Sequence, residues 1–220
     1  MVPLIEAVRA STDAVISVET YRPAVARAAF AAGADVLNNT SGLHDLELAD
    51  AVAEAGAGLV ITHSLAGPRT PFPCPAYDDV VAEVGAFLLG RVTAAVGRGV
   101  PAERIVIDPG HDLNKNTRHS LELTRRLHEI TTLGYPVLAA VSNKDFIGET
   151  LDRPQDARLE GTLATLAVCI LQGARIVRVH DVAPAVAAVR MVEGILGWRQ
   201  PAYEQHNTPL HVDRHQPGGR

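Results

Sequence analysis

The sequence contains little cysteine and no long hydrophobic segment, and each of these absences excludes a class of protein. Lysine is also rare. Only two cysteines are present among 220 residues, Cys74 and Cys169, so no disulfide framework is expected and a reducing cytoplasm is the simple interpretation. The longest apolar run without a charge, Gly161–Ala174, is too short to span a bilayer. Met1–Ala10 has no basic start followed by a long apolar core, so no signal peptide is expected. The net charge of -5 argues against a general nucleic-acid-binding protein.

The composition is that of one soluble globular domain, with 47% hydrophobic and 20% charged residues. We expect the domain to cover residues 1–199, slightly short of the roughly 250 residues of a complete eight-unit barrel. Residues 200–220 are polar and rich in Pro, Gly and His, and are predicted to form a disordered tail. Its histidines, His206, His211 and His215, are better explained by a solvated tail than by a metal site.

Six short runs of β-branched and other apolar residues alternate with segments of helical periodicity. The predicted strands are Val15–Val18, Ala34–Leu37, Leu59–Ile61, Ile105–Ile107, Val137–Val141 and Ile176–Val179. Four of the intervening helices are expected to end near a glycine, namely Gly33, Gly97, Gly134 and Gly173. Strand, helix and strand in repetition require a parallel sheet with right-handed crossovers. Six strands fit either an open doubly wound sheet or most of a barrel.

Polar or titratable side chains follow every predicted strand. They are Glu19-Thr20, Asn38 to Gly42, Thr62-His63, Asp108 with the turn Pro109-Gly110, Ser142 to Lys144, and His180-Asp181. In a parallel barrel such strand ends converge on one mouth. Each residue alone could instead be a helix cap, a turn residue or, for His63, a structural histidine. Capping does not explain Lys144, nor Arg178 and His180, which lie two apart in a strand and would form an anion or aromatic-ring site.

Lysine is confined to two positions, Lys115 and Lys144, and both follow an asparagine just beyond a strand. A bias toward arginine explains why lysine is rare but not where the two lysines lie. A compact charge whose protonation can be tuned is a plausible reason for their placement.

Several motifs, taken in order, resemble those of dihydropteroate synthase. They are Ser17 to Thr20, Asn38 to Gly42, Ile107 to Gly110 with Lys115 to Thr117, Gly134 to Leu138, Ser142 to Gly148, and Arg178 to Val182. The resemblance extends from about Val2 to Trp198 and is strongest to a divergent, inactive-type paralogue of mycobacteria and their relatives.

This resemblance implies a (β/α)8 barrel of TIM type that joins dihydropterin pyrophosphate to p-aminobenzoate in folate biosynthesis. Asn38 and Asp108 would then hydrogen-bond the amino and ring nitrogens of the pterin, and Glu19 would line the same pocket. Lys144 would contact the pterin ring, and Arg178 would stack on it. Arg178 and His180 would hold the departing pyrophosphate, so Lys144, Arg178 and His180 are the expected catalytic residues. The family also implies a homodimer formed by late helices.

The sequence departs from the family at the loop that helps bind p-aminobenzoate. The family pattern Ser-Arg-Lys-Ser-Phe is here Ser142-Asn143-Lys144-Asp145-Phe146, which lowers the local charge by about two units. Two like charges 4 Å apart repel by about 4 kcal/mol at an effective dielectric of 20, unless Asp145 pairs with Lys144 or points away. Glu19 and Asn39 each replace a family aspartate. The alternative function is therefore a catalytically inactive pterin-binding paralogue with another ligand or a regulatory role.

The chain begins where the second helix of the family ends. We therefore expect six βα units here, with the first two strands and the loop that binds magnesium and pyrophosphate outside this chain, and no metal ligand within it. A six-unit remnant would leave two exposed sheet edges, so truncation of a longer protein is favoured. A methyltetrahydrofolate-dependent methyltransferase is disfavoured because Arg178 and His180 suit a phosphate.

Overall fold

A computed structural model describes residues 1–68, 70, 72 and 74–206, and it contains all six predicted strands in parallel arrangement. The strands are β1 (Ser17–Glu19), β2 (Val36–Asn39), β3 (Gly58–Thr62), β4 (Ile105–Asp108), β5 (Leu138–Ala139) and β6 (Ile176–Val177). Strands β1 to β4 pair in sequence order, and β5 pairs with β6. A parallel bridge between Ile107 and Val137 joins the two groups, so neighbours in space are neighbours in sequence.

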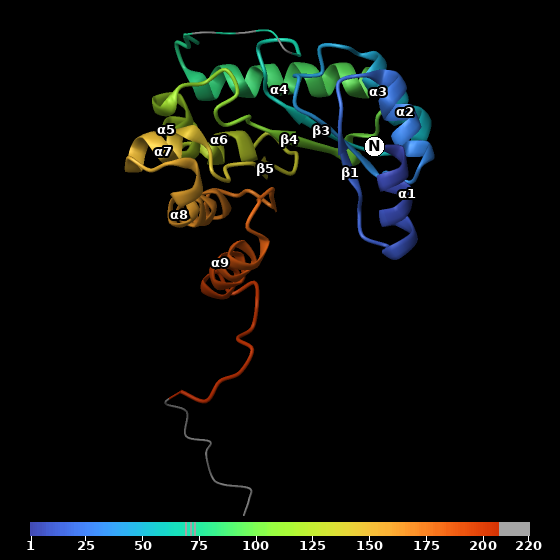
Figure 1. The fold of residues 1–220 in the computed structure, drawn as a ribbon. Helices are drawn as coiled ribbons and strands as arrows, with labels where there is room; N and C mark the ends of the chain where they lie inside the picture. Colours follow the sequence, from blue (N-terminus) through green and yellow to red (C-terminus); the bar gives the residue numbers. More distant parts are fainter. Residues whose placement is uncertain (69, 71, 73, 207–220) are drawn as a thin grey trace, which may run out of the picture.

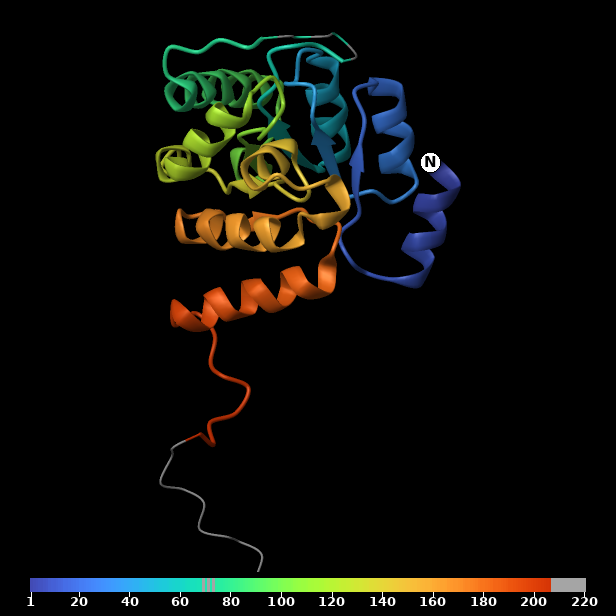
Figure 2. The ribbon, with the colours of Figure 1, turned by 60° about the vertical axis from the view of Figure 1, so that its left-hand side comes forward.

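Helices surround this sheet as an incomplete ring (Figures 1 and 2). They are α1 (Val2–Ser11), α2 (Pro23–Ala31), α3 (Glu47–Ala55), α4 (Val80–Gly97), α5 (Thr117–Arg125), α6 (Leu127–Thr131), α7 (Asp145–Leu151), α8 (Leu159–Leu171) and α9 (Val182–Ile195). Short 3-10 helices cover Ala102–Arg104 and Gln155–Ala157. The ring runs from α1 through α4 to α9 and is open between α9 and α1 (Figure 1).

The two faces of the sheet carry different side chains. The face toward the helices holds the best-buried core residues, Leu37, Leu59, Ile61, Ile105 and Ile107, which are at most 1% exposed. Residues that alternate with them face the interior of the ring. The pairs Asn38–Val60 and Thr62–Asp108 are in register, so these four side chains share the interior face. That face is apolar along the strands and becomes polar where the strands end.

Local interactions explain where several helices begin. The Asp79 carboxylate accepts hydrogen bonds from the Val81 and Ala82 amides and caps α4. Asn116 and His119 form a reciprocal capping box at α5. The helix expected through Leu123 to Ile130 is instead two helices, α5 and α6. The chain breaks at Arg126, which leaves helical geometry (φ -107°, ψ 20°) while its guanidinium binds three carboxylates, those of Asp79, Glu122 and Glu129.

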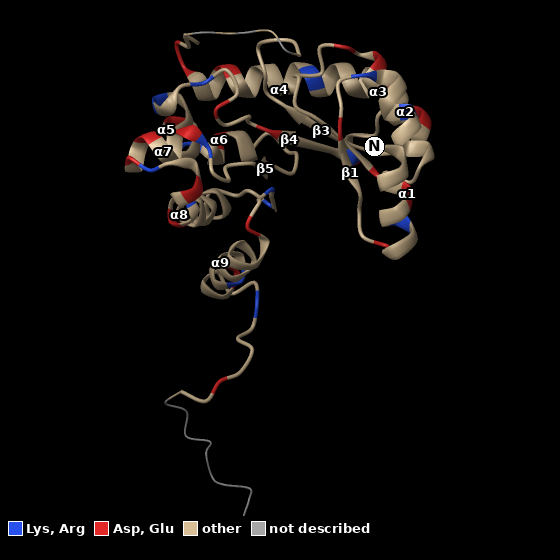
Figure 3. Cartoon of the chain, in the orientation of Figure 1, with Lys and Arg blue, Asp and Glu red and all other residues tan. Residues whose placement is uncertain are grey.

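The helices predicted to end near glycine do so, within three residues of Gly33, Gly97, Gly134 and Gly173. By length and composition, α4 is the one described helix that could cross a membrane. In the fold it packs against β3, α5 and α6 and contributes Val81, Val84 and Leu88 to the core. Acidic and basic side chains are interspersed along the helices rather than separated (Figure 3).

The predicted tail divides into two parts. Residues 200–206 have no regular secondary structure, and residues 207–220 lie outside the described residues, together with His211 and His215.

Candidate functional site

The floor of the candidate site is a buried carboxylate, Asp108, at the end of β4. Asp108 is 4% exposed and accepts a hydrogen bond from the Gly110 amide at 2.8 Å. The Thr62 hydroxyl at the end of β3 lies 3.4 Å from the other carboxylate oxygen. Burial raises the pKa of Asp108, and the Gly110 amide, Lys144, Lys115 and Thr62 oppose that rise. The site therefore holds a carboxylate whose charge depends on its neighbours.

Asn38 lies on the interior face of β2, the same face of the sheet as Asp108, with strand β3 between them. Its side-chain oxygen Oδ1 is buried and has no hydrogen-bond partner. A buried acceptor of this kind is costly unless a ligand or water supplies a donor. Asn39, the next residue, points to the other face, where its Oδ1 accepts from the Leu43 amide at 2.7 Å. Asn38 thus faces the site, whereas Asn39 holds the following turn.

Close backbone packing brings the β4 loop against the end of β3. Gly110 has φ +67°, and a Cβ atom there would lie 2.3 Å from the carbonyl oxygen of His63. Only glycine fits a left-handed position with so little space. The turn after Asp108 is therefore fixed by contact with β3, which keeps the carboxylate in place.

Both lysines reach this region. The half-buried Lys144 precedes α7 and donates a hydrogen bond to the His111 carbonyl oxygen at 2.7 Å. Lys115, 7% exposed, donates to His63 Nδ1 at 2.8 Å, to the Gly110 oxygen at 2.9 Å and to the Leu113 oxygen at 3.0 Å. Both charges act on the pKa of Asp108. Two ammonium groups thus flank one buried carboxylate.

Two buried histidines complete the polar layer under the mouth. Burial, together with the nearby Lys115, lowers the pKa of His63 to about 3. Burial, Lys115 and Lys144 lower the pKa of His111 to about 3. His63 packs edge-on against Phe87, with ring centroids 4.7 Å apart, and His111 stacks on Phe146. Both rings are therefore neutral near pH 7 and pack as part of the core.

The rim of the site is exposed and lies on the two edge strands. Glu19 ends β1 and Arg178 follows β6, and their charged groups approach to 3.7 Å although each side chain is about half exposed. The Thr40 hydroxyl donates to Glu19 at 3.0 Å. His180 Nδ1 lies 3.1 Å from the Ser142 hydroxyl. Strand β6 ends at Val177, before the predicted Val179, so Arg178 and His180 both lie in the loop.

In the loop after β5, the Asp145 side chain takes one of the arrangements that the sequence left open and lies out in solvent. Asp145 is 84% exposed in its side chain and pairs with Arg158 at 2.8 Å. Arg158 also donates to the Asn143 carbonyl oxygen at 2.9 Å. The Asp112 carboxylate, from the β4 loop, accepts from the Asp145 amide at 2.6 Å and holds the start of α7. Asp145 thus points away from Lys144, as the sequence analysis allowed, and Arg158 balances its charge.

A cavity of about 300 Å³ lies at the mouth, and Glu19 is the predicted site residue in its lining. Most of its lining side chains carry hydroxyl, amide or carboxylate groups, among them Glu19, Thr40, Ser41, Ser64 and Asn114. It occupies the loops that follow β1, β2, β3 and β4, which is the edge where polar residues were predicted to meet.

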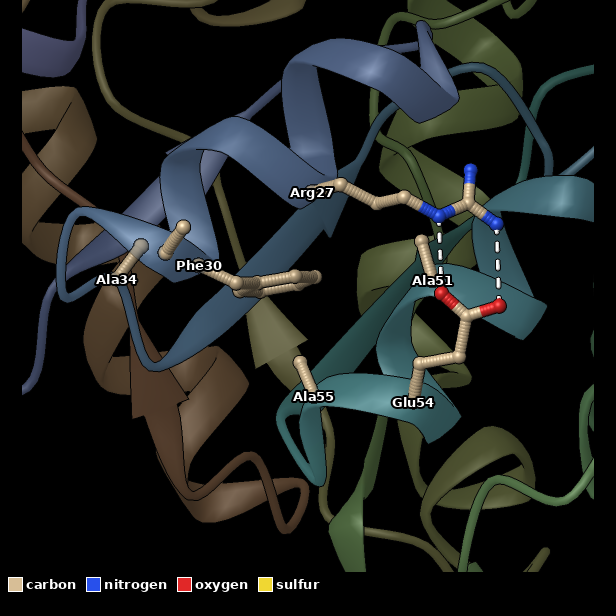
Figure 4. Close-up of a pocket in the computed structure, with 7 residues that line it drawn as sticks. Arg27, Phe30, Ala34, Ala51, Glu54 and Ala55 are labelled. Carbon is tan, nitrogen blue, oxygen red and sulfur yellow. Dashed lines mark hydrogen bonds and ion pairs between the residues drawn. The ribbon is translucent and has the colours of Figure 1, made fainter.

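A second hollow, of about 420 Å³, lies between α2 and α3 (Figure 4). Arg27 and Glu54 bridge it with two hydrogen bonds, of 2.9 and 3.3 Å, and Phe30 points into it. It is formed near the C-terminal ends of these helices, so it lies at the end of the sheet opposite the mouth. This hollow is a surface groove with a satisfied ion pair and does not belong to the site.

No group of three or more His, Cys, Asp or Glu side chains that could hold a metal ion occurs among the described residues.

The structure places Lys144 near Asp108, puts Asn38 on the same interior face two strands away, and leaves Glu19, Arg178 and His180 at the rim. Sequence reasoning did not find the roles of Asp112 and Arg158, which organise the α7 loop. A signal for Asp112 was its place in a turn after Pro109-Gly110, where it adopts φ 64°. Burial of Lys115 was also not foreseen, although its rarity had singled it out.

Fold and site define a class of protein: a parallel α/β barrel-type domain with a polar small-molecule site where its strands end. The family model described as "Pterin binding enzyme" matches residues 1–180. The chain belongs to the pterin binding enzyme family.

Individual relatives agree. "Inactive dihydropteroate synthase 2" of Mycobacterium tuberculosis is 46% identical over 208 residues, covering 91% of this chain and 65% of the relative. Dihydropteroate synthase of Escherichia coli is 34% identical over 200 residues, covering 91% of this chain and 71% of that enzyme. The Xanthomonas albilineans enzyme in complex with 7,8-dihydropteroate superposes with a TM-score of 0.83 at 38% identity, covering 89% of this chain and 72% of that one.

These similarities confirm the expected barrel class and the resemblance to dihydropteroate synthase. The chain spans a little under two thirds of the length of the mycobacterial relative. Within the described residues, the six strands run from β1 to β6 and do not close on each other.

Proposed function

We propose that this chain binds dihydropterin pyrophosphate at the mouth of the barrel. The observation that carries the proposal is a buried carboxylate, Asp108, and a buried unpartnered acceptor, Asn38 Oδ1, on the same interior face of the sheet. A pterin presents an amino group and ring N–H groups along one edge, and these donors match a carboxylate and an amide oxygen. Lys144 contacts the ring from the β5 loop, and Glu19 lines the same pocket.

The pyrophosphate group lies, in this proposal, toward the rim. Arg178 and His180 are exposed there, and Arg178 is balanced only by a long contact to Glu19. A guanidinium held loosely by one carboxylate can turn toward a phosphate, which it binds in a bidentate manner. Condensation with p-aminobenzoate would then release pyrophosphate, with Arg178 and His180 offsetting its charge and Lys144 beside the reacting centre.

The test is calorimetric titration of the protein with dihydropterin pyrophosphate. Asp108→Asn keeps the shape of the side chain and replaces one acceptor oxygen by a donor, so we expect affinity to fall about 100-fold. Asp152→Asn, in the turn after α7 and away from the mouth, is the matched control. Equal affinity for Asp108→Asn and wild type would overturn the assignment of the floor.

A second function, pterin binding without transfer, is favoured by the loop after β5. Asn143 stands where the family has a cation, and Asp112 and Asp145 bring two carboxylates to the start of α7. The mycobacterial relative is itself named as an inactive synthase. In this case the pterin pocket is retained and p-aminobenzoate is not the second ligand.

Pyrophosphate release in the presence of p-aminobenzoate separates the two functions. The protein tested is the longest natural form that includes this chain. Release that depends on p-aminobenzoate establishes the transferase. Tight binding of dihydropterin pyrophosphate without release, at saturating p-aminobenzoate, establishes the binding protein.

We also propose a cytoplasmic homodimer. Cys74 and Cys169 are both free thiols, as a reducing compartment requires. Helix α9 exposes large apolar side chains, including Val182, Met191 and Ile195, which a second copy could cover. Met191→Glu is expected to shift the sedimentation coefficient from dimer to monomer, and an unchanged coefficient would argue against this surface.

A further inference from the structure

Lys115 is a buried charge that the proposed function does not yet use. Its side chain is 7% exposed, yet it is not a strand residue and lies in the loop between β4 and α5. Burying an ammonium group is costly unless each of its protons meets an acceptor. A buried ammonium group can hold polar atoms and act on a nearby charge, which an apolar side chain cannot do.

All three protons of Lys115 are satisfied. They are donated to His63 Nδ1 at 2.8 Å, to the Gly110 oxygen at 2.9 Å and to the Leu113 oxygen at 3.0 Å. Because an ammonium group can only donate, His63 Nδ1 is the acceptor and the proton of its neutral ring lies on Nε2. The lysine therefore ties both ends of the turn after Asp108 to the end of β3.

Lys115 also acts on Asp108 electrostatically. It is one of two cations that oppose the rise in the Asp108 pKa, the other being Lys144. Cys169 of α8 lies close enough to feel the same carboxylate, and its thiol is neutral because burial raises its pKa to about 12. Thr62 and the Gly110 amide donate to the carboxylate. The charged neighbours of Asp108 are thus the two lysines.

We infer that Lys115 is a positioning residue of the pterin pocket: it holds the turn after Asp108 through three hydrogen bonds, and its positive charge favours the carboxylate form of Asp108, which accepts the donors of the ligand. This inference rests on the proposed pterin site, but the coupling between Lys115 and Asp108 does not require a ligand and can be measured without one.

The interaction between the Lys115 ammonium group and the Asp108 carboxylate is reciprocal, so each group affects the pKa of the other. Burial lowers the pKa of Lys115 to about 7, Lys144 acts in the same direction, and Asp108 and Asp112 oppose it. Loss of the Lys115 proton as the pH rises through 7 removes the support for the Asp108 charge. Protonation of Asp108 at low pH removes the acceptor. Pterin binding is therefore expected to fall on both sides of a pH optimum.

The first experiment uses the scarcity of lysine. A protein labelled with ¹³C at lysine Cε gives two resonances from this chain, one for Lys115 and one for Lys144. In Asp108→Asn we expect the Lys115 titration midpoint to fall by about one pH unit, because an attractive carboxylate is lost. Asp145→Asn is the matched control, since that carboxylate pairs with Arg158 and points away. An unchanged midpoint in Asp108→Asn overturns the inference.

The second experiment measures affinity for dihydropterin pyrophosphate against pH. Lys115→Met removes the charge and keeps most of the side-chain volume. In the plot of its affinity against pH, the fall on the acid side should move to higher pH by about one unit, and the fall near pH 7 on the basic side should disappear. Lys115→Arg, which keeps the charge, should restore the fall on the acid side. A merely structural lysine would lower affinity equally at all pH values, and that result contradicts the inference.

The two experiments separate the possible failures. If wild type does not bind the pterin but the lysine midpoint moves in Asp108→Asn, the proposed function fails and the electrostatic coupling stands. If the pterin binds and neither the midpoint nor the fall on the acid side moves, the function stands and Lys115 has no part in positioning Asp108. If Lys115→Met does not fold, the lysine resonances of wild type and Asp108→Asn decide the question.

Discussion

The floor and the rim of the site are built from different parts of the sheet. Floor residues Asn38, the penultimate residue of β2, and Asp108, the last residue of β4, lie on strands that have a partner on each side, and both are almost fully buried. Rim residues Glu19 and Arg178 adjoin β1 and β6, which are the sheet edges, and both side chains are about half exposed. Polar side chains of the site are thus buried on the inner strands and exposed at the edge strands.

This difference shows which part of the site is organised in advance. Floor groups are fixed by neighbouring strands, by the tight turn at Gly110 and by the buried bonds of Lys115, so a ligand meets them in place. Rim groups are exposed and are held by the long Glu19–Arg178 ion pair and by single hydrogen bonds to Thr40 and Ser142, so they can reorient. We therefore expect changes at the floor to affect folding and binding together, and changes at the rim to affect binding alone.

Acid should destabilise the floor most. His63 and His111 have pKa values of about 3 in the folded chain, against 6.5 ordinarily, so the unfolded chain binds more protons between these values. Stability is thus lost as the pH falls from about 6.5 toward 3, by on the order of 4 kcal/mol per histidine, with the raised pKa of Asp108 partly offsetting it. The urea midpoint measured from pH 7 to 4 checks this.

Matched histidine variants localise the acid effect. His111→Gln should flatten the pH dependence, because one of the two buried rings is removed. His128→Gln should leave it unchanged, since His128 is exposed and bonds to Gln172 on the surface. A urea midpoint that stays constant between pH 6.5 and 4 would show that these rings are protonated in the folded chain.

The turn at Gly110 should be the next most sensitive point. Gly110→Ala places a Cβ atom 2.3 Å from the His63 carbonyl oxygen at φ +67°, and we expect a loss of roughly 3 kcal/mol in unfolding free energy. Gly197→Ala, at φ +74° with nothing within 4 Å, should cost only about 1 kcal/mol of backbone strain. Equal losses would mean that β3 and the turn can separate freely.

Features of the site that depend on short stretches of chain could be predicted from the sequence. The six strands and their polar ends could be predicted because buried parallel strands are apolar runs, and a carboxylate followed by Pro109-Gly110 marks where such a run ends. Motifs then identified Asn38 and Asp108, which share the interior face of the sheet, and Lys144, whose charge acts on Asp108. These features depend on short stretches of chain.

Other features depend on residues that are distant in sequence, and these could not be predicted. The Asp112 carboxylate caps α7 from 33 residues away, and Arg158 reaches Asp145 from the far side of that helix. The break at Arg126 arises because Asp79 adds a third carboxylate from another element. No periodicity marks such contacts. The open ring between α9 and α1, by contrast, agrees with the six βα units that the motifs led us to expect.

At the rim, Arg178→Ala should lower affinity for dihydropterin pyrophosphate about tenfold, because one charged contact to phosphate is lost. The unfolding free energy should change by less than about 0.5 kcal/mol, since the side chain is exposed and its ion pair is long. The control for both measurements is Arg199→Ala. Arg199 is an exposed residue that follows α9 and pairs with Glu193 of that helix. A large loss of stability in Arg178→Ala would show that the rim is part of the folded core.

The smallest effect is expected for Glu19→Gln. This change removes the ion pair with Arg178 and a carboxylate that would repel a bound pyrophosphate, so affinity should rise about twofold at low ionic strength and show no gain at 0.5 M salt. Glu54→Gln, which breaks the surface pair with Arg27 at the opposite end of the sheet, should leave affinity unchanged. A fall in affinity for Glu19→Gln would mean that Glu19 binds the pterin directly. Glu19 of β1 would then belong to the floor of the site, together with Asn38 of β2.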